Sequence, residues 1–276
     1  MPATYAHLRF GRTVLAQLGD TPTAALIKKH RDLFEIGLQG PDILFFYHPL
    51  SSHPINRLGH WLHTQTAASF LTRAEELGGG EAEFVYLLGF ICHFVLDSEC
   101  HSHVQYYMEK TGRGHSEIET EWERFLMYRD GRDPMRHRPS GYLADTLGNA
   151  RVIAPFYGGV HPLQLRSALT SMKVVGRLLC PENSLKRNLL LKGIGLLGED
   201  PVARQLVIDP SVPEELRESN LALLQKMAQA QSVAIALMEN YLAYRQGRCP
   251  LSPRFSRTFE ADPEELVRIK EEHGNV

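Results

Sequence analysis

The residues best suited to chemistry in this chain are histidines and carboxylates that recur at helical spacing. His93 and Asp97 lie four residues apart in an apolar stretch, so a helix would place both side chains on one face. A carboxylate inside an apolar helix costs on the order of several kcal/mol unless it is paired or bound to a cation. The sequence therefore predicts that a neighbouring positive charge neutralises Asp97.

More candidate metal ligands follow this first pair. His101 and His103 come next, and His115 and Glu119 are again four residues apart. The link 110–114 contains two glycines, which let the chain turn back so that two helices face each other. Imidazole nitrogens and carboxylate oxygens together suit a divalent metal, and zinc is the commonest metal with such ligands.

The elements that must position these residues are predicted to be helices. The residues 83–96 are almost all apolar and include no proline, which is typical of a helix buried on most of its circumference. We predict that this helix covers 82–109. Further helical patterns cover 3–17, 23–36, 58–77, 114–129, 141–152, 162–180, 184–197, 213–246 and a short segment that begins near Asp262. Because no stretch shows the sustained alternation of a strand, we expect an all-α fold. We expect one domain over 1–276, with the metal-binding core in 1–130 and additional packing helices and a tail in 131–276.

Composition and charge limit the class of protein. A net charge of −2 gives no electrostatic support for nucleic-acid binding, and a hydrophobic share of 43% is ordinary for a soluble protein. The four cysteines form no CxxC pair, which favours free thiols in a reducing compartment. The first residues lack a secretory signal, and the apolar run 83–96 is short and polar at its end. We therefore expect a cytoplasmic protein with no transmembrane segment.

The order of the polar residues along the chain resembles a known family. Ten of the 13 histidines lie in 7–115. The series reads His7, Asp42, His60, His93-x3-Asp97-x5-His103 and His115-x3-Glu119, with Tyr5-Ala6-His7-Leu8, Gly40-Pro41-Asp42-Ile43 and Tyr86–Asp97 as the best-matched surroundings. This series is similar to the zinc-dependent phospholipase C family, whose fold is shared by the single-strand-specific zinc nucleases. The likeness covers about residues 1–130.

The resemblance implies a cluster of metal ions and assigns ligands to it. One zinc would take Asp42, His60, His93 and Asp97, a second would take His103, His115 and Glu119, and a third would take His7 and share Asp97. We expect two zinc ions and leave a third open. Asp42 would also be the catalytic residue that orients the attacking water or accepts its proton. The residues that bind the rest of the substrate are unknown from the sequence.

Two ligand positions have competing candidates. His101 lies at i+4 from Asp97 and is better aimed than His103 if the helix continues unbroken. The family spacing nevertheless favours His103. His63 competes with His60, and His60 is preferred because an aromatic residue follows it, as it does in the family.

The function that this resemblance implies is a metal-dependent phosphodiesterase of the phospholipase C type. Its substrate would be a phospholipid or a related phosphate ester, attacked by a metal-activated water. Two alternatives stay open: a nuclease or 3′-nucleotidase on the same fold, and a non-catalytic metal-binding module.

Overall fold

The structure is a computed structural model that describes residues 4–196, 201–211 and 213–274. Its α-helices are α1 (Thr4–Gln17), α2 (Pro22–Lys29), α3 (Arg31–Gly37), α4 (Pro54–His63), α5 (Ala67–Leu77), α6 (Glu81–Thr111), α7 (His115–Arg129), α8 (Leu147–Ile153), α9 (Pro162–Leu179), α10 (Ser184–Leu196), α11 (Pro201–Gln205), α12 (Arg217–Arg245) and α13 (Pro263–Glu272). Four 3-10 helices, η1 (Gly40–Phe46), η2 (Ala154–Tyr157), η3 (Glu214–Leu216) and η4 (Pro253–Ser256), complete the set. These ranges contain no strand, and the all-α prediction is confirmed. Residue 3, at which the predicted helix 3–17 begins, and residue 197, at which the predicted helix 184–197 ends, lie outside the described residues.

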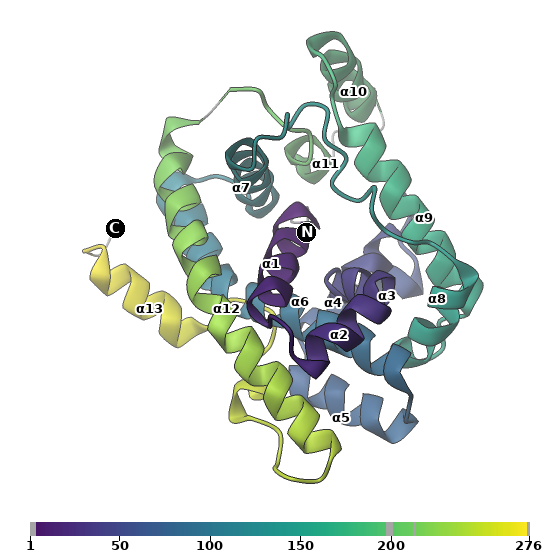
Figure 1. Ribbon diagram of the computed structural model, residues 1–276. Helices are drawn as coiled ribbons and strands as arrows, with labels where there is room; N and C mark the ends of the chain where they lie inside the picture. Colours follow the sequence, from purple (N-terminus) through teal and green to yellow (C-terminus); the bar gives the residue numbers. More distant parts are fainter. Residues whose placement is uncertain (1–3, 197–200, 212, 275–276) are drawn as a thin grey trace.

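Helix α6 is the element around which the other helices pack. Its residues from Phe84 to Cys100 are all buried, because α1, α3, α7, α12 and α13 lie against it; Figure 1 shows α12 and α13 on one side and α8 and α9 on the other. By length and composition α6 could also cross a membrane. However, 94% of its most apolar window is buried inside the fold, as in the core helix of a soluble protein.

The ends of α6 explain why it turns back into α7. The helix begins after Gly80, whose N–H donates to the Glu83 carboxylate at 2.9 Å. It ends at Gly112, which adopts the left-handed conformation at φ 71° and terminates the helix. Helix α7 then starts at His115 and runs alongside α6, so the two predicted ligand pairs come from neighbouring helices.

Several predicted boundaries differ from the structure because side chains cap helices at unexpected points. The predicted helix 58–77 is two helices, since the Thr66 hydroxyl accepts from the Ser69 N–H and starts α5. Likewise, α8 begins only after Thr146, which caps it. The predicted helix 23–36 breaks at His30, where the backbone leaves the helical region.

The crossing of α3 over α6 brings the chain that carries Asp42 to the site. The helices touch at Gly37 and Gly89, where a Cβ on Gly89 would lie 2.2 Å from the Phe34 carbonyl oxygen and 2.9 Å from Gly37 Cα. Only glycine permits such a close approach. The chain leaves α3 directly into η1, which holds Asp42 against α6.

The C-terminal half completes the core. Buried apolar residues from Tyr5 in α1 to Ile269 in α13 form one continuous cluster, and α12 packs along α6. The expected division of the chain near residue 130 stays a prediction.

The α3–α6 crossing yields a test of the fold. Gly89→Ala is expected to lower the free energy of unfolding by about 3 kcal/mol, because backbone atoms on both helices block the added methyl group. Gly193→Ala in α10, where nothing lies within 4 Å of the added Cβ, is the control and should leave stability unchanged or raise it by about 0.5 kcal/mol. Denaturant unfolding measures both, and equal effects would contradict the close crossing.

Candidate metal centre

One face of α6 presents three candidate ligands in succession. His93, Asp97 and His101 are spaced at i, i+4 and i+8, so they extend over about 12 Å along the helix. This face looks toward α1, η1, α4 and α7. Each of these elements contributes at least one further histidine or carboxylate to the centre.

Asp97 joins two groups of ligands through its two oxygens. Its Oδ1 lies 3.2 Å from Nε2 of His7, which comes from the second turn of α1. Its Oδ2 lies 3.2 Å from Nε2 of His93 and 4.0 Å from Nε2 of His63. The rings of His7 and His93 stack with centroids 4.3 Å apart. The carboxylate is therefore shared between the α1 side and the α4 side of the site.

Asp42 belongs to the α4 side of the centre. Its Oδ1 lies 3.0 Å from Nε2 of His63, and these two residues form a potential ligand group with His93. Gly40 lets the chain pass closely over His93, because it adopts φ +47° and a Cβ there would lie 2.2 Å from the His93 ring. The 3-10 helix η1 thus fixes Asp42 beside the imidazole.

A further group lies one helical turn along α6. Glu119 Oε1 is 3.1 Å from Nε2 of His115, within α7, and 3.5 Å from Nε2 of His101 across the helix pair. Glu119 is buried, whereas the side chain of His115 is 41% exposed. This group therefore contains the ligand that is most accessible to solvent.

Backbone carbonyls orient three of the histidines in the same way. The Nδ1 of His63 contacts the Gly59 carbonyl at 2.8 Å, and that of His93 contacts the Leu38 carbonyl at 3.2 Å. The Nδ1 of His101 contacts the carbonyl of Phe259. When Nδ1–H donates to a carbonyl, the lone pair of Nε2 is left for a metal, which is the usual arrangement around zinc-binding histidines.

The electrostatics of the site show that its carboxylates need positive charge. Burial opposes the charge on Asp97, yet the histidines around it hold its pKa well below the ordinary value. The same balance holds the pKa of Asp42 low and that of Glu119 well below its usual range. Burial alone would lower the pKa of His101, but Asp97 and Glu119 raise it to about 9. The ionised carboxylates thus raise the pKa of His63 and His101 against the effect of burial, whereas burial lowers the pKa of His7. A metal ion bound to these imidazoles would replace their protons.

The structure differs from the sequence-based expectation at two ligand positions. His101 rather than His103 faces Glu119, because α6 continues unbroken and the i+4 position follows the face of Asp97. His103 lies on the side of Lys226, and its pKa is lowered by burial and by that charge. The metal-ligand roles themselves stay predictions.

His63 likewise takes the place expected of His60. His63 points inward from the last turn of α4 to Asp42, whereas His60 is exposed with its ring 4.3 Å from that of Phe45. The aromatic residue that favoured His60 in the sequence, Trp61, is 55% exposed and takes no part in the group.

Phe259, in the C-terminal tail, was not expected at the site. Its N–H donates to the His63 carbonyl at 3.3 Å, and its carbonyl accepts from His101, so its backbone links two ligand-bearing helices. Its ring also lies 5.8 Å from that of His93. No spacing rule could find it, because it acts through backbone atoms 158 residues from His101.

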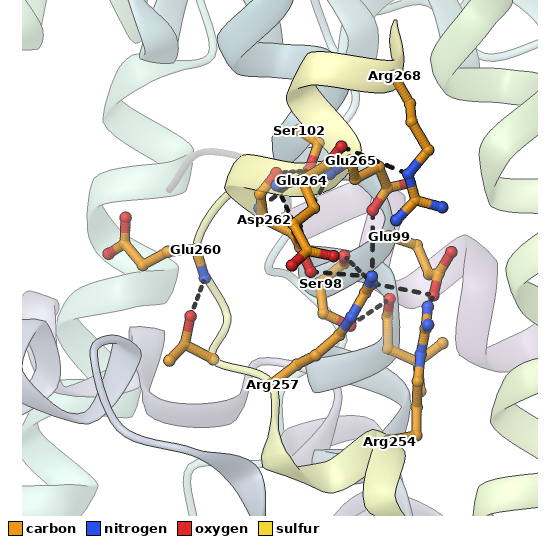
Figure 2. A network of polar contacts seen from close by, with 12 residues as sticks. Ser98, Glu99, Ser102, Arg254, Arg257, Glu260, Asp262, Glu264, Glu265 and Arg268 are labelled. Carbon is orange, nitrogen blue, oxygen red and sulfur yellow. Dashed lines mark hydrogen bonds and ion pairs between the residues drawn. The ribbon is translucent and has the colours of Figure 1, made fainter.

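Polar contacts fasten this tail to α6 next to the centre, as Figure 2 shows. The Asp262 N–H donates to the Ser102 hydroxyl at 3.0 Å, and Arg257 pairs with the Asp262 carboxylate at 3.0 Å. Arg254 pairs with the buried carboxylate of Glu99. The Ser102 and Glu99 contacts join the tail to α6, while the Arg257–Asp262 pair stabilises the tail itself.

The residues present fit metal ions. Within each of the three groups the potential ligand atoms lie within 4.8 Å of one another. The buried Nδ1 of His7 has no hydrogen-bond partner among the described residues. Nε2 of His93 has no partner there with hydrogen-bond geometry, although it lies 3.2 Å from the Asp97 carboxylate. Imidazole and carboxylate ligands of this kind suit zinc, and polar atoms buried without a partner are costly unless a ligand binds them.

Comparisons with known proteins agree with the geometry. The model of one protein family, described as zinc dependent phospholipase C, matches residues 6–160, more than half of the 276 residues. The resemblance noted in the sequence is therefore confirmed, and it extends past the residue 130 at which it was thought to end. Neither the curated proteins nor the solved structures gave a match.

The choice of histidine on α6 can be tested directly. His101→Ala is expected to weaken zinc binding at the Glu119 group by about a hundredfold or more, since the loss of even an outer-shell partner costs about 10–100-fold. His103→Ala is the matched control and should leave the zinc content unchanged. Metal analysis after competition with a chelator measures both. Loss of the ion in His103→Ala with retention in His101→Ala would contradict the arrangement.

Proposed function

Since this chain belongs to the zinc dependent phospholipase C family, we propose that it hydrolyses the phosphodiester bond of a phospholipid. The observation that carries this proposal is the position of Asp97. Its two oxygens face ligands of two different groups, which supports adjacent metal ions that share one carboxylate. We propose that Asp42, His63, His93 and Asp97 hold one zinc ion and that His101, His115 and Glu119 hold a second. His7, with the other oxygen of Asp97, offers ligands for a third ion next to the first.

Zinc ions bound in these groups would lower the pKa of a coordinated water toward about 7 and hold the non-bridging oxygens of the phosphate. The protein's part is to fix the ligands. Carbonyl contacts from Gly59, Leu38 and Phe259 set the imidazole tautomers, and burial of the three carboxylates keeps the surroundings largely free of bulk water.

Asp42 is the residue to which we assign the proton transfer. Its pKa is held low, because the hydrogen bond from His63 and the neighbouring imidazoles outweigh burial, so it is ionised at neutral pH. An ionised carboxylate at the edge of the cluster can accept the proton of the attacking water. The bond between phosphorus and the glycerol oxygen then breaks, and the proton taken from the water is returned to the leaving oxygen. The products are diacylglycerol and the phosphorylated headgroup.

Substrate would reach the centre on the side of His115. Among the described residues of the three ligand groups, only His115 has a side chain that is more than one-third exposed. The side chains of His7, His93 and Asp97 are buried. The start of α7 is therefore the edge of the site that faces solvent.

The proposal predicts zinc-dependent hydrolysis that requires Asp42. Zinc-loaded protein should cleave a chromogenic phosphodiester and phospholipid, and Asp42→Asn should lower kcat by about a hundredfold or more because it removes a general base. Asp20→Asn is the control, since Asp20 is a fully exposed carboxylate. Metal content is measured in each variant to separate lost chemistry from lost zinc.

The same assay includes single-stranded DNA and a 3′-nucleotide. Faster turnover of these substrates than of phospholipid would replace the proposal with a nuclease or nucleotidase. If no phosphodiester is cleaved by protein that contains zinc, the chain is a non-catalytic metal-binding module.

A further inference from the structure

Helix α10 is rich in leucine, yet it is not part of the core. Leucine and isoleucine make up six of its 13 residues, and none of its residues is buried. Leucine side chains in a helix are normally buried in a protein core, in an interface or in a membrane. Figure 1 shows α10 at the edge of the molecule, beyond the end of α9.

The most exposed residues of α10 lie along one stripe. Leu185, Leu189 and Leu196 are 70%, 61% and 88% exposed, and their spacing of i, i+4 and i+11 places them on one face. The last turns of α9 continue the apolar surface, because Val174 and Leu178 are 51% and 54% exposed. Lys186 reaches the Arg177 carbonyl at 3.4 Å and so ties the two helices together.

The charge on α10 indicates what could cover this stripe. The helix carries Lys186, Arg187 and Lys192 and no acidic residue, although the chain as a whole has a net charge of −2. Lys186 pairs with Glu182 at 3.4 Å and Arg187 pairs with Asp209. Lys192 is exposed beside the leucines and pairs with no carboxylate in the described part of the chain. Leucines on one face with cations at their edge are the pattern of helices that lie in the interface of an anionic membrane.

The helix is also next to the open edge of the metal centre. It contacts α11, whose Gln205 side chain lies against Gly114, the residue that caps α7. His115, the exposed ligand, follows immediately. A surface that binds α10 would thus lie near the side from which substrate enters.

We propose that α10, with the last turns of α9, docks this protein on an anionic lipid surface. The inference rests on the proposed function and adds that the substrate is taken from a membrane rather than from solution. A second copy of the chain is a poorer occupant, because pairing through this face would bring the Lys192 side chains of two helices together with no acidic residue of α10 to compensate them.

The test measures binding to vesicles without turnover. Zinc-loaded full-length protein is sedimented with phosphatidylcholine vesicles that contain or lack phosphatidylglycerol. The protein should bind the anionic vesicles, and the double variant Leu185→Ser/Leu189→Ser should bind at least about tenfold more weakly. Lys192→Glu should weaken binding roughly tenfold to anionic vesicles alone. The matched control is Leu221→Ser/Val267→Ser, which changes two exposed apolar residues on other helices and should bind like wild type.

The outcomes separate this inference from the proposed function. Hydrolysis of a short-chain, monomeric phospholipid should be the same in all these variants, while hydrolysis of vesicles should fall in the α10 variants. Vesicle binding without hydrolysis of any ester would remove the proposed function and keep the membrane contact. Equal vesicle binding by wild type and both α10 variants, or a stable dimer that the leucine substitutions dissociate, would overturn the inference. If the double variant unfolds, Lys192→Glu alone decides between these results.

Discussion

The structure depends on one buried charge, the carboxylate of Asp97 in the middle of the central helix. Ionised in an apolar interior, it would be costly if it stood alone. Histidines from α1, α4 and α6 converge on it. Burial opposes the charge, but His93, His101 and His7 hold the pKa of Asp97 well below its ordinary value. The close helix crossing at Gly89 and the turn at Gly112 both serve to bring ligand-bearing segments around this carboxylate.

The second constraint is the orientation of the imidazoles. A histidine binds a metal only through an unprotonated nitrogen, and here carbonyl groups hold the other nitrogen of His63, His93 and His101. These carbonyls come from α4, from the end of α3 and from the tail after α12. The C-terminal half therefore does more than add packing helices, since Phe259 joins two ligand-bearing helices and the ion pairs around Glu99 hold it there.

Local spacing predicted those parts of the site that lie within one helix. The pairs His93/Asp97 and His115/Glu119 follow from helical periodicity, and the all-α fold follows from the apolar patterns. The positions of His101 and His63 depend on whether a helix continues and where it ends. The family pattern favoured His103 over His101 and His60 over His63. Helical geometry alone pointed to His101. Phe259 was beyond prediction, because a backbone carbonyl carries no signal in the side-chain sequence.

The metal content of the purified protein tests the central claim most directly. Wild-type protein prepared without added metal should contain about two or three zinc ions per chain, one for each ligand group that is filled. In Asp97→Ala the content should fall to about one. The His101 group does not include Asp97, whereas Asp97 is a member of the His7 group and its Oδ2 lies 3.2 Å from His93, which the Asp42 group shares. A wild-type content below about one ion per chain, unchanged in the variant, would mean that these histidines and carboxylates form a structural network rather than a metal centre.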